Sequence, residues 1–177
     1  MLELLDTLGV DRVSYCGLSI GGMVGIWLAA NAPERIDWLV LICTAAHMPP
    51  SSAWRERAAT VLAAASTEPI AETVVGRWLT PAYAAAHPEI RAELLGMLTA
   101  SPPDGYAACC GAIERMDQRG DLPRIAARTL VISGEQDRAT PVDMQKLIAA
   151  GIPGARHEIV ARPPTSPRSS NPSESTS

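Results

Sequence analysis

A serine set between two glycines is the pattern in this sequence that most directly indicates chemistry. Gly17, Ser19 and Gly21 form a Gly-x-Ser-x-Gly motif between an apolar run and a helical run. The motif predicts a sharp strand-to-helix turn, because glycine lacks the Cβ atom that would clash in a crowded bend. Ser19 is then a candidate nucleophile, and the N–H of Ile20 is a candidate donor to the oxyanion. The alternative is an ordinary glycine-rich turn, but the flanking strand and helix favour the nucleophile.

A second candidate follows a later apolar run. Residues 128–133 predict a buried strand, and Asp137 lies in the turn directly after it. A carboxylate in such a loop can orient a histidine beside a serine, so Asp137 is the candidate acid of a Ser-His-Asp triad. The alternative is a turn aspartate ahead of Thr140. The Gly-x-Ser-x-Gly motif at Ser19 favours the interpretation of Asp137 as the triad acid.

These side chains need a parallel sheet to bring them together. Strand-length apolar runs alternate with helical runs, and the strands are predicted at residues 10–16, 36–44, 128–133 and 156–160, with helices at 1–8, 20–31 and 141–150. Ligand sites in such sheets gather at the carboxyl ends of strands, where Ser19 and His47 both fall. The predicted fold class is therefore α/β, a parallel sheet with helices on both faces.

The stretch between the second and third predicted strands has a different character. Residues 51–120 contain alanine-rich helical segments divided by prolines and no strand pattern, which predicts a helical lid inserted above the carboxyl edge of the sheet. A lid excludes water and shapes substrate choice. Its aromatic residues either line the pocket or pack between helices, and they are Trp54, Trp78, Tyr83 and Tyr106.

The predicted organisation is thus a core interrupted by the lid and followed by a tail. Its parts are core at 1–50, lid at 51–120, core at 121–161 and tail at 162–177. The tail is predicted to be disordered, because proline is its only residue capable of packing.

Composition limits the classes of partner. The chain has 177 residues, 47% of them hydrophobic, which predicts one globular domain. A net charge of −4 without a basic cluster argues against nucleic acid and favours a small-molecule partner. No apolar run approaches the roughly 18 residues of a membrane span, and the first residues lack the positive charge of a signal peptide. We therefore expect no membrane association and a cytoplasmic location.

The four cysteines show no metal-ligand spacing. They are Cys16, Cys43, Cys109 and Cys110. Cys16 and Cys43 lie in apolar strand-like runs, so we expect buried, reduced thiols and no metal site.

To about residue 160 the sequence resembles the later part of an α/β-hydrolase, and most closely the 3-oxoadipate enol-lactonases. The resembling segments are GLSIGGM at 17–23, AANAPER at 29–35, RWLTP at 77–81, GYAACC at 105–110 and SGEQD at 133–137. The resemblance implies a partial α/β-hydrolase fold and hydrolysis of a carboxylated enol-lactone to 3-oxoadipate in the β-ketoadipate pathway, without a cofactor. Ser19 and Asp137 are carried over as triad members. The substrate carboxylate needs a cation, for which His47 and Arg77 are candidates, with Trp78 beside them.

The sequence departs from this family at both ends. The family has further strands and a His-Gly turn ahead of this region, and a triad histidine after the last strand. The three histidines here are His47, His87 and His157, and none falls at that position. His87 and His157 are expected at the surface. We expect a chain truncated at both ends, with a frame change after about residue 161 replacing the histidine-bearing segment.

Two consequences follow from these departures. Activity should be impaired, and the strand at residues 10–16 should form an unprotected sheet edge open to self-association. The alternatives are a non-catalytic hydrolase remnant, a generic carboxylesterase acting on another small-molecule ester, and a hydrolase acting on a carbon–carbon bond.

Overall fold

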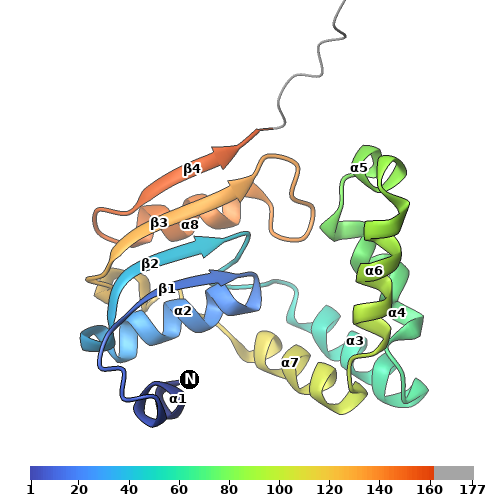
Figure 1. The fold of residues 1–177 in the computed structure, drawn as a ribbon, viewed down its shortest axis with the longest axis horizontal. Coiled ribbons are helices and arrows are strands. Elements are labelled where there is room, and N and C mark those ends of the chain that lie inside the picture. The colour runs from blue at the N-terminus through green and yellow to red at the C-terminus, as the bar shows by residue number, and fades with distance from the viewer. Residues whose placement is uncertain (162–177) are drawn as a thin grey trace, which may run out of the picture.

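A parallel four-stranded sheet organises the protein. The structure is a computed structural model that describes residues 1–161, so the predicted disordered tail lies outside the described residues. The strands are β1 (Val13–Leu18), β2 (Ile36–Ile42), β3 (Arg128–Gly134) and β4 (Arg156–Val160). They lie in the order β1-β2-β3-β4, and every neighbouring pair is parallel. The predicted parallel α/β sheet is confirmed, and its strands point in the same direction (Figure 1).

Helices provide the crossovers that parallel strands require. Helix α1 (Leu2–Thr7) precedes β1. Helix α2 (Ile20–Asn31) and the short η1 (Pro33–Arg35) join β1 to β2. The short η2 (Leu122–Arg124) precedes β3, and α8 (Val142–Gly151) joins β3 to β4. β1 begins later than predicted. The carbonyls of Val10 and Asp11 accept hydrogen bonds from the Arg35 guanidinium instead of joining the strand ladder.

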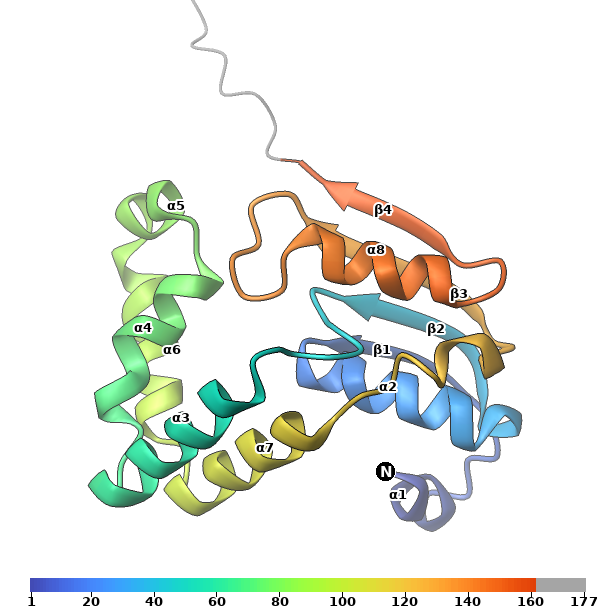
Figure 2. The same cartoon turned by 180° about the vertical axis from the view of Figure 1, so that it is seen from behind.

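The main core lies on one face of the sheet. Ile26 of α2 and Ile148 of α8 join one buried cluster with Leu39, Leu41 and Val131 of the strands, so both helices cover the same face (Figure 2). Within residues 1–161, the expected cover of helices on both faces is met on this face alone.

Alternate side chains project from the other face of the sheet. Leu18 and Trp38 are 62% and 47% exposed, and Val40 and Ile42 are partly exposed. The continuous apolar runs of β2 suit a strand covered on both sides. We call the uncovered surface, which carries Leu18, Trp38, Val40 and Ile42, the open sheet face.

Five helices occupy the stretch between β2 and β3 in which the sequence predicts a helical insertion. They are α3 (Ser51–Ala64), α4 (Glu68–Trp78), α5 (Pro81–Ala86), α6 (Pro88–Thr99) and α7 (Pro103–Arg115). Val74 and Val75 of α4 pack with Leu98 of α6 in a separate small core. The helices lie beyond the carboxyl ends of the strands (Figures 1 and 2), where a ligand of the sheet would bind. In residues 1–161 no helix has both the length and the apolar character needed to cross a bilayer.

Candidate active site

The turn between β1 and α2 holds Ser19 in a strained conformation. Its backbone has φ 52° and ψ −119°, a region that costs a non-glycine residue roughly 1–3 kcal/mol. Two contacts from β2 and its continuation hold it there. The Ser19 N–H donates to the carbonyl of Ile42 at 3.0 Å, and the Thr44 hydroxyl donates to the Ser19 carbonyl at 2.7 Å.

Within residues 1–161 the Ser19 hydroxyl forms no hydrogen bond. Ser19 precedes α2 as its N-cap residue but makes no side-chain capping bond, and it is exposed. Ile20 is the first residue of α2, so its N–H has no intrahelical acceptor and lies at the positive end of the helix dipole. The turn therefore presents a free hydroxyl next to a free N–H, as nucleophilic attack on a carbonyl requires.

The glycines of the motif have unequal roles. A Cβ atom on Gly17 would overlap the carbonyl group of Gly21 and lie 2.6 Å from the nitrogen of Gly22. A Cβ atom on Gly22 would lie 2.7 Å from the Thr44 side chain. Gly21 has nothing within 4 Å among the described residues, so the expectation that it avoids a clash is wrong. Glycine is therefore required at 17 and 22, because backbone atoms of the turn and the Thr44 side chain already fill the space that a Cβ atom would take.

Asp137 lies in the loop after β3, as predicted, and its carboxylate is held by that loop. One oxygen accepts from the N–H groups of Ala139 and Thr140 at 2.8 and 2.9 Å, and the other accepts from the Thr140 hydroxyl at 2.7 Å. Burial raises the pKa of the neighbouring Cys43 thiol, and the Asp137 charge raises it further. Asp137 thus lies beside the end of β2, the strand next to the Ser19 turn.

Ser19 opens into a cleft between the sheet edge and the helical insertion, which we call the Ser19 cleft. Its apolar lining is Met23, Met48, Trp54, Val74, Trp78 and Ile113. Its other lining residues are Ser19, Arg57, Arg77, Ala139 and Thr140. The structure therefore brings together the candidate nucleophile, the loop of Asp137 and the candidate substrate-binding residues Arg77 and Trp78.

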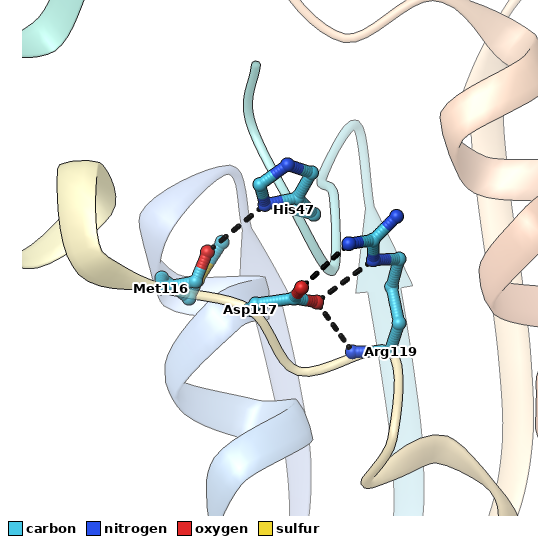
Figure 3. Close-up of polar contacts among 4 residues, drawn as sticks. All are labelled: His47, Met116, Asp117 and Arg119. Carbon is cyan, nitrogen blue, oxygen red and sulfur yellow. Dashed lines mark hydrogen bonds and ion pairs between the residues drawn. The ribbon is translucent and has the colours of Figure 1, made fainter. Parts of the chain in front are cut away.

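His47 lies outside the Ser19 cleft, contrary to the prediction that it binds substrate. Its Nδ1 atom lies 3.2 Å from the carbonyl oxygen of Met116 (Figure 3). His47 also pairs with Asp117 in an isolated antiparallel bridge. The sequence could not reveal this, because the bridge joins residues on opposite sides of the insertion. His47 helps to fasten the base of the helical insertion.

The other two histidines are also occupied elsewhere. His157 shares a hydrogen bond of 2.7 Å with Ser133 and is partly buried, so its predicted surface position is met only in part. This hydrogen bond joins the neighbouring strands β3 and β4. His87 stacks on Tyr83 at 4.4 Å and pairs with Glu89, at the surface as predicted. None of the three histidines lines the Ser19 cleft.

The aromatic residues of the insertion divide between the two predicted roles. Trp54 and Trp78 line the Ser19 cleft. Tyr106 packs against the core of α4 and α6, and Tyr83 is exposed. Arg57 also lines the cleft and was missed by the sequence analysis. Its spacing of three residues from Trp54 was a usable signal, because residues at that spacing share a helix face.

The cysteines are free thiols, but two of the four are exposed. Cys16 projects from the open sheet face and Cys109 is exposed on α7, so their predicted burial is wrong. Cys110 is buried and Cys43 partly buried. Among the described residues no group of three histidine, cysteine or acidic side chains is placed to hold a metal ion.

Comparison with known proteins accounts for this architecture. A family model described as the α/β hydrolase fold matches residues 1–162. The chain belongs to the α/β-hydrolase family. This α/β-hydrolase chain is 40% identical over 142 residues to 3-oxoadipate enol-lactonase 2 of Acinetobacter baylyi, covering 80% of this chain and 53% of that protein.

Solved structures agree with this membership. A hydrolase from Pseudomonas aeruginosa superposes with a TM-score of 0.86 at 42% identity, and the enol-lactonase from Burkholderia xenovorans with 0.86 at 34% identity. Each alignment covers 90% of this α/β-hydrolase, but 60% and 61% of those chains. The chain thus spans little more than half the length of these relatives.

Proposed function

We propose that this α/β-hydrolase hydrolyses carboxylic esters and lactones through Ser19, and that its substrate is the 3-oxoadipate enol-lactone of the β-ketoadipate pathway. The observation that carries the proposal is the strained, unbonded Ser19 in one cleft with the cation Arg77. Similarity to two proteins named as enol-lactonases supports the choice of substrate.

The proposed reaction begins with attack of the Ser19 oxygen on the lactone carbonyl. The developing oxyanion accepts a hydrogen bond from the Ile20 N–H. The ring oxygen leaves as an enol, which is a better leaving group than an alkoxide and converts to the ketone, so little acid assistance is needed. Water then cleaves the acyl-Ser19 ester and releases the dicarboxylate. Arg77 pairs with the substrate carboxylate, and Trp78 packs beside the ring.

The weak element of this machinery is the base. A histidine between Ser19 and Asp137 would take the serine proton, but none of the three histidines of the chain lies in the Ser19 cleft. Removing the histidine of a serine triad costs about 10⁶-fold in turnover in the best-studied case. We therefore expect very slow hydrolysis by this chain unless a base is supplied.

Free imidazole supplies that base and tests the proposal. We expect imidazole to raise enol-lactone hydrolysis by the chain in a concentration-dependent way, and Ser19→Ala to remove the increase. Thr99→Ala is the matched control, since its hydroxyl bonds carbonyls within α6, away from the cleft. A simple aryl ester assayed in parallel should react more slowly, because it has no carboxylate for Arg77. Equal imidazole-dependent rates for the wild type and Ser19→Ala would refute the proposal.

A second candidate function is a non-catalytic hydrolase remnant that binds small molecules. The absence of a histidine from the Ser19 cleft favours it. Labelling of Ser19 by a fluorophosphonate distinguishes the two, because reaction requires an activated hydroxyl. No labelling in the presence of imidazole would favour the remnant.

A further inference from the structure

The Ser19 cleft carries an excess of positive charge. Arg57 and Arg77 both line it, whereas no acidic side chain does so among the described residues. The whole chain has a net charge of −4, so the cleft is opposite in sign to the molecule around it. A concave site lined by one sign of charge raises the local concentration of the opposite ion. The cleft therefore favours an anionic ligand.

Neither guanidinium is neutralised by an acidic side chain of the described part of the chain. In the ion pairs formed by residues 1–161, Arg57 and Arg77 have no acidic partner. Arg55 provides the contrast on the same helix, because it pairs with Glu114 at 2.6 Å. The nearby acid of α7 is thus used by Arg55, and Arg57 keeps its charge for another partner.

Arg57 is also held in place. Its guanidinium carbon lies 4.5 Å from the centroid of the Trp54 ring, in a cation–π contact. Tyr106 of α7 is a second neighbour of Arg57. Burial raises the pKa of the Tyr106 phenol, and the positive charge of Arg57 and its hydrogen bond with the phenol oppose that rise. Stacking uses the face of the guanidinium, so the N–H donors in its plane that do not face the Tyr106 hydroxyl stay available to a carboxylate.

We propose that Arg57 is a specificity-determining residue that, together with Arg77, binds the carboxylate of the substrate while Ser19 faces its carbonyl. The two arginines come from different helices, α3 and α4, so one carboxylate links both helices across the cleft. This inference rests on the proposed function, because it assigns a role within the same site. It predicts a preference for carboxylated acyl compounds over neutral ones.

The test measures binding rather than turnover, so it does not depend on a catalytic base. Adipate, a six-carbon dicarboxylate with no bond to cleave, is titrated into the chain by calorimetry, with the fluorescence of Trp54 and Trp78 as a second signal. Adipamide is the neutral ligand of the same shape. We expect Arg57→Gln to weaken adipate binding by about 10- to 100-fold, the loss typical of a hydrogen bond to a charged group, and to leave adipamide unchanged.

Two further variants separate charge from structure. Arg156→Gln is the matched control, since Arg156 pairs with Glu158 on β4 and lies outside the cleft. It should leave adipate binding unchanged. Arg57→Lys keeps the charge and should bind adipate more tightly than Arg57→Gln, with both variants checked for native circular dichroism. An equal loss of adipate and adipamide in Arg57→Gln, or no loss of either, would overturn the inference.

The outcome also separates this inference from the proposed function. Adipate binding that depends on Arg57, in a chain whose Ser19 shows no imidazole-dependent reaction, would retain the anion site and reject the hydrolase. Imidazole-dependent hydrolysis at Ser19 with no effect of Arg57→Gln on either ligand would retain the hydrolase and reject the anion site.

Discussion

Alanine substitution at two glycines of the same motif should have opposite effects on stability. In Gly17→Ala, the new methyl group meets the backbone of Gly21 and Gly22, which cannot rotate away as a side chain could. Overpacking of this kind costs about 3 kcal/mol in the free energy of unfolding. In Gly21→Ala, the methyl group meets open space within α2, where alanine stabilises a helix by about 0.5–1 kcal/mol relative to glycine. The two variants should therefore differ by about 4 kcal/mol.

Urea unfolding followed by circular dichroism measures this difference. With a slope of about 2 kcal/mol per molar urea, the midpoints of the two variants should lie about 2 M apart, with the wild type between them. Gly17→Ala should also lose the imidazole-dependent reaction of Ser19, because relief of the clash must move the turn. If Gly21→Ala were as damaging as Gly17→Ala, the close approach described for Gly17 would not be what the motif requires.

Three further predictions concern the surface. Side-chain and backbone N–H donors of Arg119 hold the pKa of Asp117 well below its ordinary value. The wild type should therefore be more stable than Asp117→Asn above about pH 4 and lose that advantage as the pH falls further. Equal urea midpoints of the two proteins at pH 7 would contradict this. Iodoacetamide should modify the exposed Cys16 and Cys109 before the buried Cys110, whose pKa is raised by burial, and mass spectrometry after brief exposure would show the order. We also propose that β1, an edge strand of the described sheet, pairs with β1 of a second copy of the chain. Sedimentation velocity should then show larger species as the protein concentration rises. A monomer at every concentration would exclude this pairing.

The sequence predicted the features that depend on local structure. The turn at Ser19 could be predicted because a strand, the glycines and a helix occur within about twenty residues. Asp137 was found in the same way, from its place directly after an apolar strand. Such features need only the periodicity of neighbouring residues and the sterics of a bend.

Features that depend on long-range packing were missed. His47 lies at a strand end, but its neighbour Met116 is remote in sequence, so no local pattern could show that its ring turns to the insertion. Arg57 lines the cleft on a helix, α3, that packs against α7, and these two helices are remote in sequence. An apolar run such as that of β2 also cannot reveal which of its faces the helices cover.

The two ends of the helical insertion are fastened to each other. The N–H of Gln118 donates to the carbonyl of Ala46 at 2.8 Å, and the Gln118 amide donates to the carbonyl of Met23 in α2 at 3.0 Å. The chain therefore leaves the strands and rejoins them at neighbouring points. A change in length or sequence between those points leaves the register of the strands untouched. The helical insertion can therefore be exchanged as a module while the turn at Ser19 stays in place, and under the proposed function such an exchange would vary the compounds accepted.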